Sequence, residues 1–182
     1  MRPALLEDAA ALSAIYAPYV ATNAVSYETE APNARQMRSR MEQSDGVYPW
    51  IVAAEGEIVL GYGYAYAKPF RPGEPYQHIV EVGVYAAGDL EGKGIRRSLL
   101  TSLVATLTNQ CFTQALCTLI TPNDRLIQVY ESTGFRRAGV FREVCYKNGQ
   151  WSDIGLWQRE LAEPTSPPRD LRSFHETGVV RA

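Results

Sequence analysis

Residues 91–100 read Glu-Gly-Lys-Gly-Ile-Arg-Arg-Ser-Leu-Leu, a glycine-containing turn that leads into an amphipathic helix. The apolar segment 78–85 precedes it and is typical of a buried strand. A helix start presents free backbone N–H groups, and the helix dipole favours negative charge there. Glycines let an anion approach the main chain closely. The segment therefore predicts a binding site for phosphate groups.

The charges of this turn only partly favour an anion. Glu91 would repel a phosphate group by on the order of a few kcal/mol before screening. The long side chain of Arg96 could either crowd the phosphate or turn outward and pair with it. Lys93 and Arg97 add to Arg96, so the turn stays net positive. We expect weakened rather than abolished binding; the alternative is a simple capped helix start.

Glu81 interrupts an otherwise apolar strand and is the candidate general base. An unpaired carboxylate is costly in apolar surroundings, so its side chain either faces a cleft or has a partner. In a cleft, the carboxylate could take a proton from an amine, which is mostly protonated at neutral pH. The alternative is a glutamate at a sheet edge or in a salt bridge.

The hydrophobic periodicity predicts which elements position these residues. Helices are expected over 7–20, 32–42, 92–109 and 123–133. Strands are expected over 49–55, 58–67, 79–86, 114–121, 136–147 and 152–161. Asn148-Gly149 predicts a tight hairpin turn between the last two strands. Residues 1–162 therefore form one domain, and the proline-containing tail 163–182 is predicted to be mobile or draped on the surface.

Composition narrows the class of protein. A chain of 182 residues suits a single domain, and its net charge of −2 without a basic face argues against nucleic acid as a partner. No apolar run approaches the roughly 20 residues of a membrane helix, so no membrane partner is expected. Three cysteines without CxxC spacing suit buried thiols in a reducing cytoplasm. Two histidines cannot build a histidine-rich site, so no metal is expected.

Several stretches, in order and spacing, resemble the phosphinothricin acetyltransferases and their methionine-sulfoximine-acetylating relatives, a family of the GNAT superfamily. The stretches are Tyr48-Pro49-Trp50, 80–85, Pro122-Asn123-Asp124, 130–135 and 146–158. Together with the turn at 91–96, they cover roughly residues 2–162. The resemblance implies an α/β (α+β) class, the GNAT fold, with a mixed, mostly antiparallel twisted sheet flanked by helices. It also implies acetyl-CoA as co-substrate and a homodimer, with the C-terminal strands, including Trp151 and Trp157, near the interface.

The resemblance assigns cofactor contacts to two segments. Val84, Tyr85 and Ala86 match the strand end whose backbone pairs with the pantetheine arm, and the Val84 N–H would also stabilise the thioester carbonyl as charge develops. The family's pyrophosphate loop is written Q/R-x-x-G-x-G/A; Gly94 matches it, whereas Glu91 and Arg96 depart. The residues implied in phosphate binding are Gly92, Lys93, Gly94, Ile95, Arg96 and Arg97. Asn123 resembles an asparagine that binds the cofactor arm, or is simply a helix N-cap.

The resemblance also implies roles in catalysis and substrate binding. Glu81 stands where the family has its proposed general base, and Tyr130 would be the general acid that protonates the leaving thiolate. The alternative for Tyr130 is a packed aromatic residue with one hydrogen bond. Arg71 resembles a loop cation, usually Lys, that contacts the acidic end of the substrate, and Gly73 replaces a second cation. By the same analogy, Tyr27 and Tyr85 lie near the substrate.

Three functions compete on these grounds. The first is acetylation of the α-amino group of a small amino-acid-like molecule of the phosphinothricin or methionine sulfoximine/sulfone type, by direct attack. The second is a non-catalytic or weakly CoA-binding dimeric module, which Glu91 and Arg96 favour. The third is acetylation of protein N-termini or lysines, which an enclosed site walled by Trp50 and Phe70 disfavours. The joint presence of Glu81, Asn123 and Tyr130 favours the first.

Overall fold

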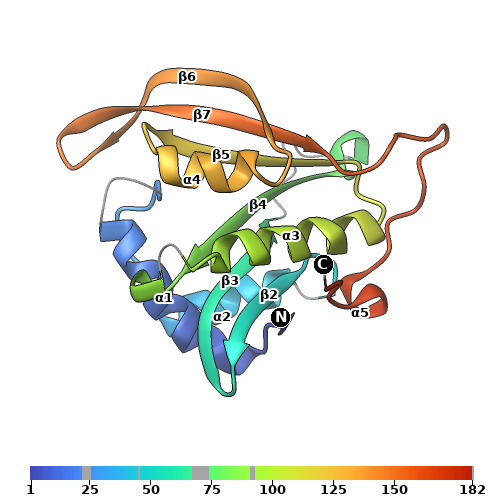
Figure 1. The fold of residues 1–182 in the computed structure, drawn as a ribbon, viewed down its shortest axis with the longest axis horizontal. Helices are drawn as coiled ribbons and strands as arrows, with labels where there is room; N and C mark the ends of the chain where they lie inside the picture. Colours follow the sequence, from blue (N-terminus) through green and yellow to red (C-terminus); the bar gives the residue numbers. More distant parts are fainter. Residues whose placement is uncertain (22–25, 45, 67–73, 91–92, 182) are drawn as a thin grey trace.

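One mixed sheet spans the described part of the chain, with seven strands in the order β1-β2-β3-β4-β5-β7-β6 (Figure 1). The computed structural model describes residues 1–21, 26–44, 46–66, 74–90 and 93–181. The strands are β1 (Arg2–Pro3), β2 (Trp50–Glu55), β3 (Ile58–Tyr66), β4 (Ile79–Ala86), β5 (Gln114–Thr121), β6 (Arg136–Lys147) and β7 (Gln150–Glu160). Among these strands β4 and β5 pair in parallel, and the other neighbours are antiparallel. The predicted fold class is confirmed.

Helices cover both faces of this sheet. They are α1 (Ala9–Ala21), α2 (Ala34–Gln43), α3 (Ile95–Asn109), α4 (Asp124–Glu131) and α5 (Phe174–Thr177). Alternate residues of a strand point to opposite faces. Val80, Val82 and Val84 of β4 accordingly pack with α3, whereas Tyr85 packs with α1 and α2. Two apolar clusters, one on each face, therefore hold β4 between them.

The aromatic side chains of β2, β3 and β4 gather on the face covered by α1 and α2. Trp50 stacks on Tyr64 with a centroid distance of 4.7 Å, and Tyr62 lies 5.3 Å from Tyr85. Tyr62 and Tyr64 share this face, as alternate residues of one strand do, and the Tyr66 side chain lies outside the described part. Of this layer, Tyr64 and Tyr85 line the cavity described below, whereas Trp50 and Tyr62 do not.

The hairpin of β6 and β7 extends beyond the rest of the sheet (Figure 1). Asn148 and Gly149 have positive φ angles of 49° and 79°, as the Asn-Gly pair predicted for a tight turn. Phe141, Tyr146 and Trp151 are more than half exposed on this hairpin. Trp157 is buried instead, and its indole N–H donates to Glu131 Oε1 at 3.1 Å. Of the two tryptophans expected near an interface, only Trp151 is therefore available to a partner.

The chain after β7 returns along α3 (Figure 1). The Arg172 N–H donates to Gln110 O at 3.0 Å, and the Val180 N–H donates to Thr106 Oγ1 at 3.0 Å. Phe174 of α5 is buried, and its N–H donates to Gly46 O at 2.8 Å. These contacts hold the tail after residue 162 against the surface of the domain. Its mobility in solution stays a prediction. Within the described ranges, no helix is both long and apolar enough to cross a bilayer.

Candidate active site

The parallel strands β4 and β5 form a fork. Their residues pair at only three positions, and the last pair is Glu81 with Leu116. Beyond this pair β4 continues to Ala86 and β5 to Thr121 without further pairing between them. α4 follows β5, and its Tyr130 hydroxyl donates a long hydrogen bond of 3.4 Å to Val82 O. The fork thus leaves one edge of β4 open beside α4.

The open edge of β4 carries backbone groups in a predictable alternation. In an antiparallel pair, alternate residues direct their N–H and C=O groups toward the neighbouring strand or away from it. The Ala87 N–H donates to Leu60 O of β3, whereas Val82 O accepts from Tyr130 on the opposite side. By this alternation the polar groups of Val84 also face the fork. This orientation suits the predicted role of the Val84 N–H.

A cavity of about 730 Å³ opens at the fork, on the face covered by α1 and α2. Its wall includes five of the predicted site residues: Tyr27, Glu81, Val84, Tyr85 and Tyr130. The structure therefore brings together both proposed catalytic side chains and the two tyrosines predicted to lie near the substrate. Arg71 lies outside the described residues, so its position relative to this cavity stays a prediction.

Glu81 lies at the branch point of the fork and is half-buried. Its carboxylate Oε1 accepts a hydrogen bond of 2.5 Å from Thr118 Oγ1. Both sequence-based possibilities for this residue are realised, because it faces a cavity and also has a partner. That partner is a neutral hydroxyl, and no described cation forms an ion pair with Glu81. Among the described residues, the carboxylate therefore faces the cavity without a cation beside it.

Tyr130 is both packed and directed into the cavity. Its ring is 2% exposed and meets Phe135 edge-on with a centroid distance of 5.2 Å. Burial raises the pKa of its phenol well above the usual value. The phenol therefore holds its proton at neutral pH, which is the state that a general acid requires.

The start of α3 borders a second cavity, of about 590 Å³, with a different character. Gly94 is the N-cap and has a φ angle of 77°, a left-handed conformation that glycine adopts without strain. Arg96, Arg97 and Arg125 all line this cavity. Three cations at a helix N-terminus suit phosphate groups. Glu91 and Gly92 lie outside the described residues, and Lys93 is exposed.

Arg96 makes a contact that the sequence did not indicate. Its Nη2 donates to the Tyr19 hydroxyl, and its guanidinium carbon lies 5.3 Å from the centroid of the Tyr19 ring. The same hydroxyl donates to Ala86 O at 2.5 Å and accepts from the Ala86 N–H at 3.3 Å. Arg96 thus points toward α1 and ties the start of α3 to the end of β4.

The start of α4 carries two further residues of interest, of which the sequence pointed only to the first. Asn123 is the N-cap of α4, with its side chain accepting from the Leu126 N–H at 3.3 Å, as one of the two predictions had it. Arg125 in the next turn was missed, although a cation so close to a predicted helix start could have been noticed. It joins Arg96 and Arg97 because α4 begins beside α3.

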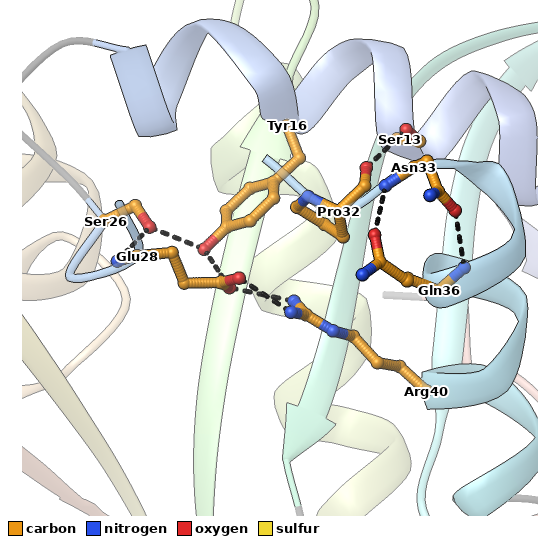
Figure 2. A network of polar contacts seen from close by, with 8 residues as sticks. All are labelled: Ser13, Tyr16, Ser26, Glu28, Pro32, Asn33, Gln36 and Arg40. Atoms are coloured by element: carbon orange, nitrogen blue, oxygen red, sulfur yellow. Dashed lines mark hydrogen bonds and ion pairs between the residues drawn. The ribbon is translucent and has the colours of Figure 1, made fainter. Parts of the chain in front are cut away.

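The far end of the larger cavity carries a network of polar contacts that the sequence did not predict (Figure 2). Arg40 of α2 donates to both carboxylate oxygens of Glu28, at 2.8 and 2.6 Å. The Tyr16 hydroxyl donates to Glu28 at 2.9 Å and lies 2.7 Å from Ser26 Oγ. Burial alone would raise the pKa of Glu28, but the hydrogen bonds from Arg40 and Tyr16 lower it below its usual value. Burial raises the pKa of Tyr16 to about 12.

Lys147, at the end of β6, anchors the segment that carries Tyr27. The residue is only 6% exposed, and its Nζ donates to Val20 O at 2.7 Å and to Ser26 O at 2.9 Å. Two carbonyl acceptors offset the cost of burying an ammonium group. The contact joins the C-terminal hairpin to the segment before α2 and so fixes one side of the cavity.

Residues 1–156 match the family described as the acetyltransferase (GNAT) domain, and the chain belongs to this family of N-acetyltransferases. A phosphinothricin acetyltransferase of the GNAT superfamily from Sinorhizobium meliloti, solved in complex with acetyl-CoA, superposes with a TM-score of 0.84. The two share 30% identity, over 91% of this chain and 89% of that one.

Two curated relatives indicate to which group of GNAT acetyltransferases the chain belongs. The phosphinothricin N-acetyltransferase of Streptomyces viridochromogenes is 33% identical over 172 residues, which are 94% of this chain and 92% of the relative. The L-methionine sulfoximine/L-methionine sulfone acetyltransferase of Pseudomonas aeruginosa is 29% identical, over 92% of this chain and 98% of the relative. The chain is therefore a GNAT acetyltransferase of the phosphinothricin/methionine sulfoximine acetyltransferase-like group, as the sequence motifs predicted.

Proposed function

We propose that the chain transfers the acetyl group of acetyl-CoA to the α-amino group of a small amino-acid-like substrate, with Glu81 as general base and Tyr130 as general acid. The observation that carries the proposal is the fork, where a carboxylate, a phenol and the open edge of β4 share one cavity. A cavity of about 730 Å³ is of the size that small-molecule sites have. The substrate class follows from the relatives, which act on phosphinothricin and on methionine sulfoximine or sulfone.

The residues at the start of α3 suit the phosphate-bearing part of acetyl-CoA. Gly94 brings the main chain close to an anion, and Arg97 and Arg125 supply positive charge beside it. β4 runs from Ala86, at this cavity, toward Glu81, and the polar backbone groups of Val84 face the fork, which suits an extended amide-containing arm. When bound, acetyl-CoA supplies the thioester whose acetyl group is transferred.

The chain's own residues account for the movement of protons. Glu81 takes one proton from the substrate ammonium, which leaves an amine with a free electron pair. The nitrogen–carbon bond then forms while the Val84 N–H hydrogen-bonds the developing oxyanion. As the carbon–sulfur bond breaks, Tyr130 gives its proton to sulfur and recovers one from the nitrogen. The products are the amide, the thiol and one proton that must leave Glu81.

A substrate screen tests this function. Purified protein is mixed with acetyl-CoA and methionine sulfoximine, methionine sulfone, phosphinothricin or a lysine-containing peptide, and release of the CoA thiol is followed. We expect saturable turnover with at least one amino-acid analogue and none with the peptide. Turnover confined to the peptide, or acetyl-CoA binding without turnover of any amine, would contradict the proposed substrate class.

We further expect a homodimer formed through the β6–β7 hairpin. Phe141, Val144, Tyr146 and Trp151 each expose more than half of their surface there, and large apolar side chains are seldom gathered on a free surface. Sedimentation of the protein and of Trp151→Glu tests this expectation. A dimer that the substitution disrupts supports it, whereas an unchanged dimer places the interface elsewhere.

A further inference from the structure

Thr118 is a polar residue of β5 that reaches across the fork. It follows Leu116, the last β5 residue paired with β4, by two positions and so lies on the same face of the strand. Its hydroxyl donates to Glu81 Oε1 at 2.5 Å, and both side chains line the larger cavity. A threonine hydroxyl can donate one hydrogen bond, and here the Glu81 carboxylate accepts it.

Tyr27 extends this contact toward solvent. Its phenol lies close enough to Thr118 and Glu81 for both to act on it, and its side chain is 41% exposed at the cavity wall. The Lys147 ammonium group of β6 donates a hydrogen bond to the carbonyl of Ser26, the residue before Tyr27, and so helps to fix the position of Tyr27. Two oxygen-bearing side chains, Thr118 and Tyr27, thus lie between the carboxylate and the surface.

The titratable side chains closest to Glu81 are neutral at physiological pH, while the charged pair of Glu28 and Arg40 lies on the wall of the same cavity. Cys117 of β5, Tyr64 of β3 and Tyr130 of α4 all act electrostatically on the same region, and burial raises the pKa of each. Tyr27 faces Glu81 from the segment before α2, and its pKa is also raised by burial. Among the described residues, the side chain that contacts the Glu81 carboxylate is therefore a neutral hydroxyl donor rather than a cation.

We propose that Thr118 is a positioning residue that orients the Glu81 carboxylate and, with Tyr27, conducts its proton to solvent. The inference rests on the proposed function, because it requires Glu81 to be the base. After the substrate N–H bond breaks and Glu81 is protonated, the Thr118 hydroxyl turns its proton from Glu81 toward the Tyr27 oxygen, and Glu81 passes its new proton to the Thr118 oxygen. Thr118 passes its own proton to the Tyr27 oxygen, and Tyr27 releases its proton to water. Each group ends with the number of protons with which it began.

The test compares Thr118→Val with Thr118→Ser, which keeps the hydroxyl, and with Thr121→Val. Thr121 lies on the same strand, and its hydroxyl is directed to Asp153 O at 3.4 Å. We expect Thr118→Val to lower kcat/KM by about tenfold and to move the acidic limb of its pH profile to higher pH. The direction follows because a lost hydrogen bond to the charged carboxylate favours its protonated form. Thr118→Ser should keep kcat/KM within about twofold of the wild type and should keep the acidic limb in its place. Thr121→Val should leave both kcat/KM and the pH profile unchanged.

A double-mutant cycle separates this inference from the function on which it rests. If Thr118 acts through Glu81, Thr118→Val should cost less than about twofold in a Glu81→Gln background. An equal loss in both backgrounds, or a single variant with wild-type kcat/KM and pH profile, overturns the role of Thr118. A Glu81→Gln variant with wild-type activity instead overturns the proposed base.

Tyr27→Phe tests the outer link without changing the sheet. We expect kcat to fall about threefold or more with KM nearly unchanged, because the proton leaves the site more slowly. This variant also covers the case in which Thr118→Val fails to fold. A kcat equal to that of the wild type overturns the conduction of protons through Tyr27.

Discussion

The two cavities at β4 differ in the charge of their walls. Around Glu81 the larger one presents hydroxyl groups and aromatic rings, whereas the smaller one at the start of α3 presents Arg96, Arg97 and Arg125. β4 connects them, since Val84 lines the first and Ala86 the second. One region is suited to handling protons, the other to holding an anion. The separation shows how a single strand can present a charged co-substrate to a carboxylate that is surrounded mainly by hydroxyl groups and aromatic rings.

The sharpest test of this division removes the base. We expect Glu81→Gln to fold and to lose a hundredfold or more of kcat/KM at neutral pH, because general bases contribute about that much. Its acetyl-CoA affinity should stay close to that of the wild type. Steady-state kinetics across neutral pH and calorimetric titration measure the two quantities. Wild-type kcat/KM across the whole range would remove Glu81 from the chemistry.

Tyr130→Phe should have the next largest effect. It keeps the packing against Phe135 and removes only the hydroxyl. We expect kcat to fall by about tenfold or more, since the departing thiolate loses its proton donor. Thermal unfolding serves as the control for packing. An effect under about twofold would mean that Tyr130 is only a packed aromatic residue.

The arginine-lined cavity should respond in acetyl-CoA affinity rather than in chemistry. Arg97→Ala and Arg125→Ala should each weaken binding by about threefold and reduce its dependence on salt. Arg96→Gly should instead tighten binding by a similar factor, because its guanidinium is turned to Tyr19 while its side chain stands beside Gly94. Glu91→Gln is expected to act in the same direction by removing a repulsion. Titration of each variant with acetyl-CoA at low and physiological salt measures these changes. Weaker binding of acetyl-CoA by Arg96→Gly would show that the Arg96 guanidinium contacts phosphate.

The smallest expected effect concerns the Glu28–Arg40 pair at the far end of the larger cavity. Because the pKa of Glu28 is lowered in the folded state, its stabilising contribution is present above the unfolded pKa and is lost as pH falls through the folded pKa. Glu28→Gln should therefore lower the free energy of unfolding by about 1 kcal/mol or less at neutral pH. In acid the difference should vanish. Urea unfolding of the wild type and the variant at neutral and at acidic pH measures this difference in the free energy of unfolding. An equal difference at both pH values would exclude an ionic origin.

Much of the site followed from local patterns. Glu81 stood out because a carboxylate is rare in an apolar strand, and Gly94 because a glycine after a strand and before a helix predicts an open backbone. The Asn-Gly turn located the last hairpin. Each of these signals lies within a few residues along the chain, so no knowledge of the fold was needed to read it.

The contacts that the sequence did not reveal join segments far apart in the chain. Thr118 and Glu81 are 37 residues apart, Arg96 and Tyr19 are 77 apart, and Lys147 and Ser26 are 121 apart. A threonine in a strand or a lysine at its end carries no local mark of such a partner. Arg96 illustrates the limit: its type predicted a contact with phosphate or a clash, and the fold directs it to a tyrosine of α1.

The sequence by itself determined the elements, their polarity patterns and the residue types at the turn and the strand, because these depend on short-range periodicity and backbone preference. The tertiary structure alone decided which of those residues meet. The fork exists because β5 pairs with β4 only as far as Glu81 and then diverges, which opens the edge of β4 and brings Thr118 to the carboxylate. Such a divergence is a property of two strands packed between two helical layers, and neither strand encodes it alone.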